Sequence, residues 1–418
     1  MKILIIGATG FIGKSIYVTL RKEAYEVIAG IRSPQKFDGD AIKIDFLTLQ
    51  KDKKLVQKLK GFDVIINTVG IIAPKDGQSF EQMHTIAPMA LFDAAREAGV
   101  KKIIHISALG SQEGTTAYHT SKDKADKHLR NLGLNYCILH PSIVYGEDGK
   151  STALFQALAS LPFIPLIGDG SQKLQPITID DLSATVLKAI HSNEKKVELS
   201  VVGKEPITYK ELLQGFRKWL GYTPTRAISI PTLGTNFIGK LLDEPTVNQD
   251  NITMLNEGNT ADVKALETFL GYTPIGFKEK LSKTNANNAQ KLYASLYLLR
   301  PLLRLVIGFV WIWSGIVSAF LYPQPLALEL LHEIGIPMGL DIPLLYVASF
   351  LDISIGILTI VGYRLQAFLA FQVAVIAVYT VLLTLLAPHH WLHPFGPVLK
   401  NLPLILSIYI LSRLEKFR

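Results

Sequence analysis

The sequence predicts an α/β domain with a doubly wound parallel sheet and a small C-terminal subdomain, followed by an all-α bundle of four transmembrane helices. Two observations support this prediction. Residues 1–200 alternate short apolar runs with helical patterns, as parallel strands and their crossover helices do. Beyond residue 300, apolar stretches long enough to cross a bilayer replace this alternation. A chain of 418 residues also exceeds one ordinary hydrophobic core, so we expect two domains.

The first expected strand, residues 2–6, runs directly into a glycine-rich turn, and a helical pattern follows. A dinucleotide requires this order: the first glycine turns the chain, the second lets the backbone approach the pyrophosphate, and the third lets helix and strand pack closely. The helix N-terminus then offers N–H groups to the phosphates. A glycine-rich turn without a ligand is the alternative. The residues expected to bind the dinucleotide here are Gly7, Thr9, Gly10, Phe11, Ile12 and Gly13.

Four further strands are expected where short apolar runs recur, at residues 26–30, 63–69, 102–107 and 136–139. Residues 203–282 are more polar and form a small subdomain that completes a first domain over 1–282. Residues 283–300 are expected to be a linker and an amphipathic helix at the membrane surface, because leucines recur there at helical spacing. The membrane domain then covers residues 301–418.

The GxxGxxG spacing with its embedded Ala8-Thr9-Gly10 resembles the extended and atypical short-chain dehydrogenase/reductases, over about two-thirds of the chain. The segments Gly168-Asp169-Gly170, Gln175-Pro176-Ile177 and Asp180-Asp181-Leu182 also match the atypical branch. That branch includes the nucleotide-binding accessory subunit of respiratory complex I. The resemblance implies a Rossmann-type NAD(P)-binding domain, and it implies that residues 203–282 lie on the substrate side.

Tyr118 and Lys122 form a YxxxK motif, whose spacing places both side chains on one face of a helix. An ammonium group there favours the phenolate and lowers the pKa of the tyrosine, so Tyr118 can exchange a proton with a carbonyl or hydroxyl group. The resemblance implies that Lys122 also holds the nicotinamide ribose and that Ser107 binds the substrate oxygen. The alternatives are an ordinary amphipathic helix and a family member that keeps the fold without the chemistry.

The end of the second expected strand bears on the choice of cofactor. NAD-specific sites usually place a carboxylate there, to accept from the ribose 2′-hydroxyl. This sequence instead has Arg32 and Ser33, and the guanidinium can pair with a 2′-phosphate. We therefore expect NADP as the cofactor, with NAD as a possible one; a surface arginine in a loop is the alternative.

The family resemblance implies further cofactor contacts along the same edge of the sheet. His140 stands where the family commonly has an arginine, a departure that bears on substrate anchoring. Asp45 and Phe46 would bracket the adenine. The residues expected beside the nicotinamide and its ribose are Asn67, Val69, Gly70, Pro141, Ser142 and Val144.

Membrane spans are expected at residues 302–321, 343–362 and 365–387, with a short fourth at 398–412. By the positive-inside rule, basic residues at one end place both termini and the nucleotide-binding domain in the cytoplasm, on a multi-pass protein of the cell inner membrane. These residues are Arg300, Arg304, Arg364, Arg413, Lys416 and Arg418. This part resembles the DoxX-like family through Trp311-Ile312-Trp313-Ser314-Gly315, Leu351-Asp352-Ile353-Ser354-Ile355-Gly356, Pro394-Phe395-Gly396-Pro397 and Lys400-Asn401-Leu402-Pro403.

The expected membrane domain also contains ionisable residues that could have a function. Asp352 lies within a span, so we expect it to face the bundle interior. His389, His390 and His393 occupy an outer loop without an accompanying carboxylate or cysteine, so we expect an interfacial cluster and no metal site. The net charge of +8 is spread along the chain and does not indicate nucleic-acid binding. Membrane lipid is the expected surface partner.

These observations predict a membrane-tethered, NADP(H)-dependent oxidoreductase that acts on a carbonyl or quinone-like lipophilic substrate. The alternative is a non-catalytic NAD(P)-binding assembly or sensor subunit, with a membrane complex as its partner. Sugar epimerase or dehydratase chemistry is a third interpretation, disfavoured by His140 at the anchoring position.

Overall fold

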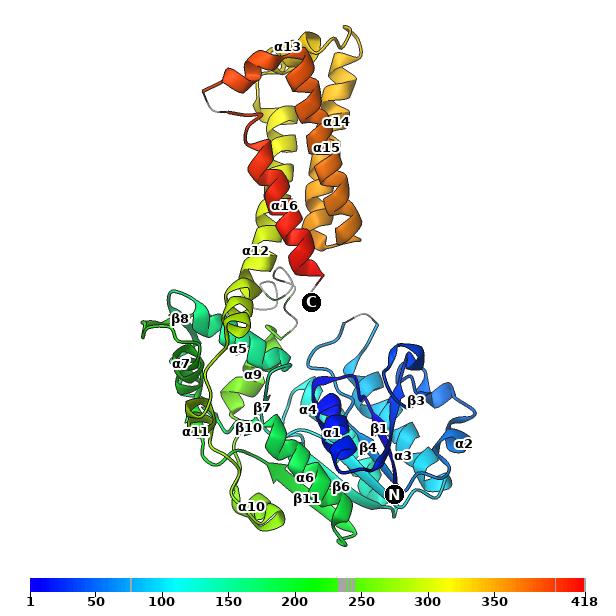
Figure 1. Cartoon of the computed structure of the whole chain (residues 1–418). Helices are drawn as coiled ribbons and strands as arrows, with labels where there is room; N and C mark the ends of the chain where they lie inside the picture. The colour runs from blue at the N-terminus through cyan, green and yellow to red at the C-terminus, as the bar shows by residue number, and fades with distance from the viewer. Residues whose placement is uncertain are drawn as a thin grey trace. The chain divides into compact units, whose positions relative to one another are not determined.

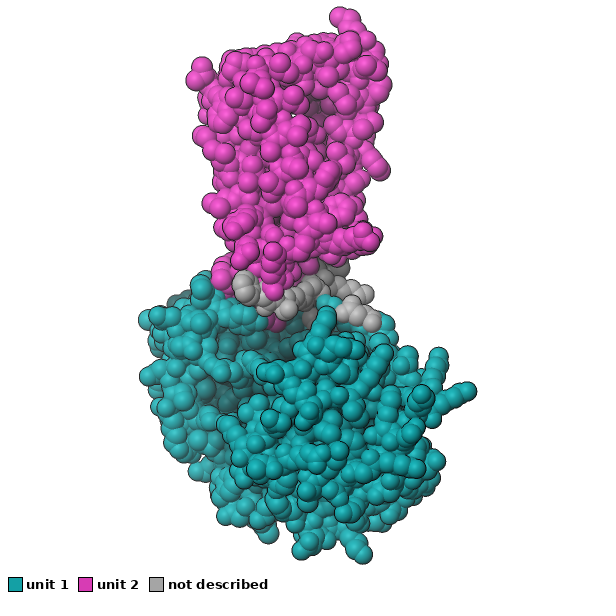
Figure 2. All heavy atoms as spheres, turned by 45° about the vertical axis from the view of Figure 1, so that its right-hand side comes forward, with its two compact units in different colours: residues 1–240, 244–295 teal, residues 241–243, 296–418 magenta. Residues whose placement is uncertain are grey.

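The computed structural model describes residues 1–75, 77–231, 239, 242, 244, 246–394 and 396–416. The chain forms two compact units, Met1–Lys240 with Glu244–Ser295, and Leu296–Arg418 with the short segment Leu241–Asp243 (Figure 2). We call them the α/β unit and the helical unit. Two residues of the sequence-based predictions, Phe395 and Arg418, lie outside the described residues.

The α/β unit is built on a seven-stranded sheet of order β11-β6-β5-β4-β1-β2-β3, in which every neighbouring pair is parallel (Figure 1). The predicted doubly wound parallel sheet is thus confirmed. The strand β11 is not among the expected ones, because it lies at the sheet edge and alternates buried with exposed residues. The strands are β1 Lys2–Ile6, β2 Glu26–Ile31, β3 Ala41–Lys43, β4 Val64–Asn67, β5 Lys102–Ile106, β6 Asn135–Pro141 and β11 Lys196–Val201.

Helices cover both faces of this sheet, since alternate residues of each strand point to opposite faces. Ile3 and Ile5 of β1 pack in one core with α1 and α6, whereas Leu4 and Ile6 pack in a second core with α3 and α4. Apolar side chains dominate both cores, as expected for strands buried on two sides. The helices around the sheet are α1 Phe11–Lys22, α2 Leu55–Leu59, α3 Ala87–Glu97, α4 Ala117–Asn131 and α6 Ile179–His191.

The subdomain has a core of its own, which includes the rings of Phe216 and Phe277 in edge-to-face contact. It draws on residues from 144 onward, because β8 pairs with β13 and α5 packs on α7. A capping box at Thr208 and Glu211 starts α7. Its elements are β7 Val144–Tyr145, α5 Lys150–Ser160, β8 Ile164–Ile167, β9 Lys173–Leu174, β10 Ile177–Thr178, β12 Ile207–Thr208, α7 Tyr209–Trp219, β13 Ala227–Ile230, α9 Gln249–Glu257 and α11 Phe277–Ser282. The helix α10 Lys264–Leu270 packs instead on α6 and β11 of the main sheet.

The helical unit contains α12 Asn288–Ile316, α13 Gln324–Glu333, α14 Asp341–Val361, α15 Leu365–Leu386 and α16 Asn401–Glu415. Three of its helical stretches are long and apolar enough to cross a membrane, namely Asn288–Leu321, Asp341–Val361 and Leu365–Leu386. The expected fourth span corresponds to α16, whose 15 residues fall short of a full crossing. The all-α four-helix prediction holds, with α13 as an additional short helix.

One expectation differs from the structure at the junction of the two units. Instead of a linker and a separate interfacial helix over residues 283–300, α12 runs unbroken from Asn288 to Ile316. Reciprocal hydrogen bonds between Asn287 and Gln290 start it, and Pro301 lies inside it. The leucine spacing that indicated an amphipathic helix therefore belongs to the first turns of the long helix.

Small residues let the helices of this unit approach closely. A Cβ atom at Gly308 would lie 3.0 Å from the carbonyl oxygen of Gly356, and one at Gly356 would lie 2.5 Å from that of Gly308. Such glycine contacts are typical of helix pairs in membranes. Large apolar side chains point outward instead, with Phe350 and Leu385 each 72% exposed. This arrangement suits a lipid surrounding.

Candidate active site

The glycine-rich turn has the geometry that its sequence predicts. Gly7 adopts φ +86°, a conformation that favours glycine, and a Cβ at Gly13 would lie 2.2 Å from the Gly7 carbonyl oxygen. A Cβ at Gly10, in contrast, would meet only that carbonyl oxygen, at 3.3 Å. Gly10 is the N-cap of α1, and no side chain caps the helix there. The N-terminus of α1 therefore presents uncapped N–H groups that fit a dinucleotide phosphate.

The parallel strands bring the other expected residues to this same carboxyl edge. A Cβ at Gly7 would touch Thr68 Oγ1 at 2.9 Å and Val69 Cγ2 at 3.0 Å, so the glycine turn lies against the end of β4. Asn67 is fully buried there and accepts from the backbone N–H of Val69. Lys122 reaches the same place, because its Nζ is 3.2 Å from the position of a Cβ on Gly70.

Tyr118 lies in the first turn of α4 and is enclosed by aromatic rings. The rings of Phe80, His84 and His119 contact it edge-on at centroid distances of 5.8, 5.3 and 5.6 Å. Burial raises the pKa of Tyr118 to about 12. The expectation that Lys122 lowers this pKa is therefore wrong for this structure, because removal of the ring from water outweighs the ammonium. Among the residues that the structure describes, the Tyr118 hydroxyl forms no hydrogen bond.

His84 is a neighbour of Tyr118 that the sequence analysis missed. The backbone N–H of Ile71 donates to its Nε2, so Nδ1 carries the proton and donates to Ser121 Oγ. The Ser121 hydroxyl in turn donates to the carbonyl oxygen of Tyr118. Burial and the charge of Lys122 lower the pKa of His84 to about 2. His84 is thus a neutral group that positions the start of α4.

The Ser107 hydroxyl is engaged by a buried carboxylate. It donates to Asp126 Oδ2 at 2.5 Å, and Asp126 is fully buried. Asp126 lies one turn after Lys122 on α4, on the same helix face. The Lys122 ammonium donates to the carbonyl oxygen of Ile106, and its pKa is lowered to about 8 by burial, against the opposing effect of Asp126. The role of Ser107 in substrate binding stays a prediction, and its hydroxyl already donates its proton to a buried carboxylate.

Asp126 is the centre of a buried polar network. His105 Nε2 lies 3.5 Å from Asp126 Oδ1, and Ser111 Oγ donates to Asp126 Oδ2. His140 lies 4.0 Å from the same carboxylate and 3.8 Å from Glu198, so it belongs to this network. The i, i+4 spacing of Lys122 and Asp126 is the sequence signal that could have identified the network.

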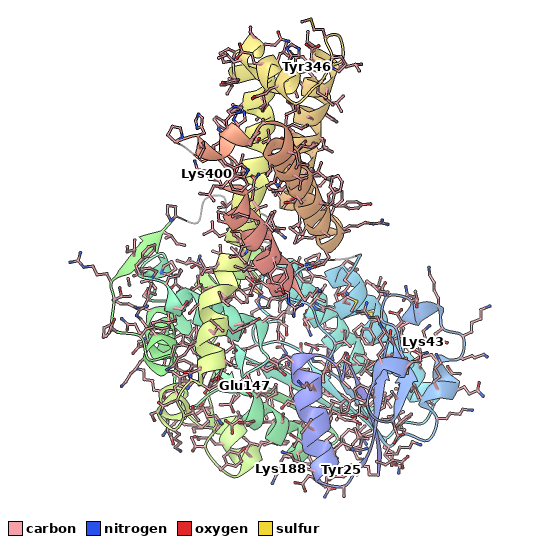
Figure 3. All side chains as sticks on the ribbon, turned by 45° about the horizontal axis from the view of Figure 1, so that its top comes forward. Tyr25, Lys43, Glu147, Lys188, Tyr346 and Lys400 are labelled. Carbon is pink, nitrogen blue, oxygen red and sulfur yellow. The ribbon has the colours of Figure 1, made fainter. Side chains whose placement is uncertain are left out.

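The expected 2′-phosphate site lies at the ends of β2 and β3. Arg32 and Ser33 follow β2 directly and are exposed. Lys43, which pairs with Ile31 in the sheet, is exposed beside them (Figure 3). Asp45 Oδ1 accepts from the backbone N–H of Leu47, while the Phe46 ring is buried in the core. The ring of Phe46 is therefore unavailable to an adenine, and two cations face this corner.

The segment after β6 lies over the start of α1. The backbone N–H of Ser142 donates to the Val201 carbonyl oxygen, and its hydroxyl donates to Gln175. Pro141 ends β6 and Val144 starts β7. A Cβ at Gly146 would lie 3.1 Å from the Phe11 ring. These contacts bring Pro141, Ser142 and Val144 to the edge that carries the glycine turn.

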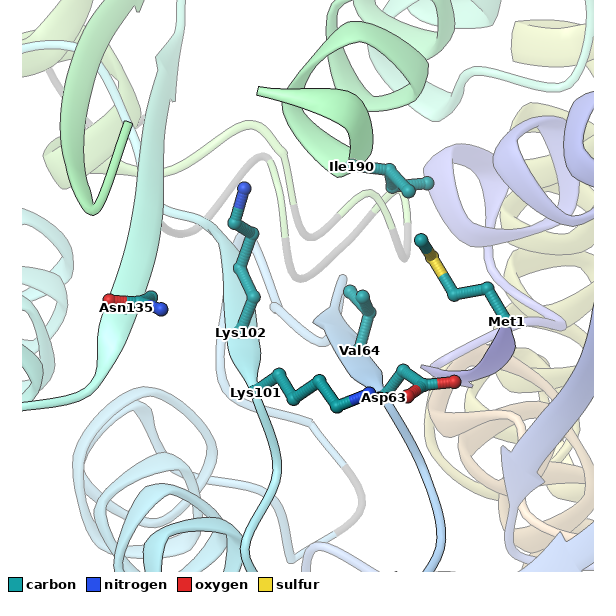
Figure 4. Close-up of a pocket in the computed structure, with 7 residues that line it drawn as sticks. All are labelled: Met1, Asp63, Val64, Lys101, Lys102, Asn135 and Ile190. Atoms are coloured by element: carbon teal, nitrogen blue, oxygen red, sulfur yellow. Dashed lines mark hydrogen bonds and ion pairs between the residues drawn. The ribbon is translucent and has the colours of Figure 1, made fainter. Parts of the chain in front are cut away.

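A surface pocket elsewhere in the unit is unrelated to this edge. Figure 4 shows Met1, Asp63, Lys101 and Asn135 around it, at the amino ends of β1, β4, β5 and β6. An ion pair between Lys101 and Asp63 closes one side, at 2.6 Å. Ligands of open α/β sheets bind at the carboxyl ends of the strands. The pocket therefore carries no argument for the cofactor.

Two predictions about the helical unit can be compared with the structure. Asp352 is half-buried, and one of its oxygens has no hydrogen-bond partner among the described residues, as expected for an inward-facing group. The expectation that no carboxylate accompanies the outer histidines is wrong. Glu333, from α13, lies 3.1 Å from His389 and 3.2 Å from His390. Sequence spacing could not show this contact, since more than 50 residues separate the groups.

Comparison with known proteins agrees with this architecture. Residues 7–191 match the NAD(P)H-binding family, and residues 308–409 match the DoxX-like family. The chain is 26% identical to a ceramide reductase of Caulobacter vibrioides over 58% of this chain and 77% of that protein. It is 27% identical to the mouse mitochondrial NADH dehydrogenase [ubiquinone] 1 alpha subcomplex subunit 9, over 44% of this chain and 52% of that subunit. The match thus spans about half the length of the mouse subunit.

Solved structures share the fold of the α/β unit. A nucleoside-diphosphate-sugar epimerase from Staphylococcus aureus superposes with a TM-score of 0.55 at 18% identity, over 67% of this chain and 99% of that one. MoeE5 in complex with UDP-glucuronic acid and NAD superposes with a TM-score of 0.54 at 19% identity, over 68% and 97%. At this identity the likeness shows the fold alone. The chain therefore joins a Rossmann-type domain that matches the NAD(P)H-binding family, and is similar to the mitochondrial subunit, to a C-terminal domain that matches the DoxX-like family.

Proposed function

We propose that the chain is a membrane-anchored, NADP(H)-dependent oxidoreductase that transfers a hydride between the cofactor and a carbonyl or quinone-like group of a lipophilic substrate. The observation that carries this proposal is the Tyr118 hydroxyl, which forms no hydrogen bond among the described residues and belongs to the same helix face as Lys122. The likeness to a ceramide reductase supports a membrane lipid as the substrate class.

The residues fit a nicotinamide dinucleotide, because the turn at Gly10 leaves room that a side chain would fill. When bound, the nicotinamide supplies or accepts the hydride. Tyr118, whose pKa of about 12 keeps the phenol protonated, would donate its proton to the substrate oxygen as that oxygen gains negative charge. Lys122, with a pKa of about 8, would be a cation at neutral pH and would stabilise the phenolate that this step leaves.

The cofactor proposal favours NADP over NAD. Arg32 is exposed at the end of β2, and Lys43 adds a second positive charge beside it. Replacing Arg32 with alanine should weaken NADPH binding about ten- to a hundredfold, since charge-assisted hydrogen bonds contribute about 1.5–3 kcal/mol. NADH binding, measured by the same fluorescence titration, should stay nearly unchanged. Equal losses for both cofactors would show that Arg32 only supports its loop.

The helical unit is proposed to cross the cell inner membrane several times, with both termini in the cytoplasm. Arg300 and Glu415 form an ion pair at 3.7 Å, and a guanidinium nitrogen of Arg304 lies beside Gly362. Arg364 lines a surface pocket together with Glu415, so Arg300 and Arg364, which are distant in sequence, lie at one end of the unit, as a cytoplasmic end requires. Because α12 runs from the α/β unit into the helical unit, the site is tethered to the membrane that holds its substrate.

The direct test is the substitution Tyr118→Phe in the full chain reconstituted in lipid nanodiscs. It should leave NADPH affinity unchanged and reduce turnover of a lipid ketone or quinone by about 10²–10⁴, the usual contribution of a positioned proton donor. Tyr25→Phe is the matched control. Tyr25 precedes β2, at the amino ends of the strands and so away from the candidate site, and its hydroxyl contacts His191. Undiminished turnover in Tyr118→Phe would contradict the assignment.

A non-catalytic assembly or sensor subunit is the second candidate. It is favoured by the likeness to the mouse complex I subunit and by the engagement of Ser107 with Asp126. Under this alternative, NADPH binds and stabilises the chain, but no carbonyl or quinone in a broad substrate panel is reduced. Turnover by the wild-type chain that Tyr118→Phe abolishes would exclude it.

A further inference from the structure

We propose that Glu333, His389 and His390 form a binding site for a divalent transition-metal ion of the zinc class. One ligand atom from each residue lies within 4.8 Å of the others. The site is distinct from the dinucleotide edge, since all three residues belong to the helical unit. Two imidazoles and one carboxylate are a ligand set that zinc uses where it keeps an open coordination position.

The backbone brings these groups together from segments far apart in sequence. Glu333 is the last residue of α13, and Gly335, at φ +88°, turns the chain away directly after it. His389 and His390 lie in the short 3₁₀ helix Pro388–Leu392, which follows α15. The indole N–H of Trp391 donates to Thr384 Oγ1 at 3.0 Å and holds this short helix against α15.

The distances suit a shared ion. His389 Nε2 lies 3.1 Å from Glu333 Oε1, and His390 Nε2 lies 3.2 Å from Glu333 Oε2. A tetrahedral zinc ion with bonds of about 2.0–2.2 Å holds its ligand atoms about 3.3–3.6 Å apart. Small adjustments of exposed side chains would therefore seat the ion. The histidine rings lie 4.3 Å apart, and the Nε2 atom of each faces the Glu333 carboxylate.

Access and local charge also favour a cation. The side chains of His389, Glu333 and His390 are 61%, 35% and 24% exposed, so an ion can enter from solvent. The neighbouring His332 is directed elsewhere, because its Nε2 bonds Asp341 at 2.8 Å. A bound metal ion would link the end of α13 to the segment after α15. These connections lie at the end of the helical unit opposite the C-terminus of α16 (Figure 1).

The test is zinc binding by the full chain in detergent, purified without a polyhistidine tag and stripped with EDTA. Calorimetric titration with Zn²⁺ should give one site per chain with a Kd below about 10 µM. Replacing His389 or His390 with alanine, or Glu333 with glutamine, should weaken binding by more than about tenfold, since even outer-shell partners of a metal contribute 10- to 100-fold. The triple variant should lose the site.

His332→Asn is the matched control and should bind zinc as the wild type does. A second readout is quenching of Trp391 fluorescence by Cu²⁺, which should disappear in the triple variant and in Trp391→Phe. These signals do not depend on enzymatic activity. The proposal is overturned if the wild type shows no saturable zinc binding, which would leave an ordinary histidine–carboxylate cluster. It is also overturned if the triple variant, with an unchanged circular dichroism spectrum, binds zinc as tightly as the wild type.

Discussion

The two units differ in the buried network of polar side chains that each contains. In the α/β unit, the core around α4 contains charged side chains: Lys122 and Asp126 are 4% and 0% exposed. In the helical unit, the hydrogen-bonded network between the helices is uncharged: the Trp311 indole N–H donates to Gln372, whose amide donates to Thr359. Arg304 and Asp341 are also buried in this unit but are not part of that network. The apolar surface is reversed as well, with Phe350 and Leu385 facing outward.

The difference shows what each surrounding permits. A water-soluble unit can enclose an ionic pair when many hydrogen bonds satisfy it, and such pairs contribute to function more than to stability. A unit in lipid gains little from burying apolar surface, so close backbone contacts and neutral hydrogen bonds hold it together. The charged network of the α/β unit therefore lies beside the candidate site, whereas the neutral network of the helical unit supports packing.

The largest effect predicted by this comparison is at Asp126. Asp126→Asn removes the charge beside Lys122 and one acceptor of Ser107. The free energy of unfolding of the α/β unit should fall by roughly 2–4 kcal/mol. Hydrogen exchange of peptides from α4, followed by mass spectrometry, measures this loss.

Asp93→Asn is the control for that measurement, because Asp93 forms a half-exposed pair with His128 on the outside of the same layer. It should change stability by no more than about 1 kcal/mol. Similar exchange rates in both variants would show that the network around Asp126 is no more stabilising than a surface pair.

A second effect is expected from His84 on acidification. The unfolded chain binds a proton at this residue below pH 6.5, whereas the pKa of about 2 keeps the folded chain from doing so. Unfolding is therefore favoured as pH falls from 6.5 towards 2, by about 1.4 kcal/mol per pH unit. His84→Gln should reduce the slope of the free energy of unfolding against pH by about 1.4 kcal/mol per pH unit, which corresponds to one proton. An unchanged slope, measured by urea titration between pH 6.5 and 4.5, would show that His84 is already protonated in the folded chain.

The smallest effect is expected in the helical unit. Gln372→Leu removes two buried hydrogen bonds but keeps the volume apolar. Interhelical hydrogen bonds in membranes average about 0.6 kcal/mol, so the loss should be near 1 kcal/mol. Thermal unfolding in nanodiscs checks this value. If Gln372→Leu lowered the free energy of unfolding as much as Asp126→Asn does, the buried networks of the two units would not differ in their contribution to stability.

Much of the fold and part of the site follow from the sequence. Buried parallel strands read as continuous apolar runs, and the glycines at 7, 10 and 13 have the roles that their spacing predicts. The direction in which Ser107 points could not be predicted, because it depends on Asp126, which approaches from another element. The pKa of Tyr118 depends on enclosure by Phe80 and His84, and Glu333 meets the histidines only through tertiary contacts. These contacts and this pKa depend on packing between elements that are distant in sequence, and the periodicity of the sequence does not encode such packing.

The central claim is that this chain moves a hydride between NADPH and a lipophilic substrate with Tyr118 as proton donor. The most direct measurement uses NADPH carrying deuterium at nicotinamide C4 and full-length protein in nanodiscs that contain a lipid ketone. We predict that mass spectrometry detects one deuterium on the carbinol carbon of the product, and that Tyr118→Phe reduces its formation about 10²–10⁴-fold. Tight NADPH binding without any deuterated product across ketone and quinone substrates would contradict the account and favour a non-catalytic subunit.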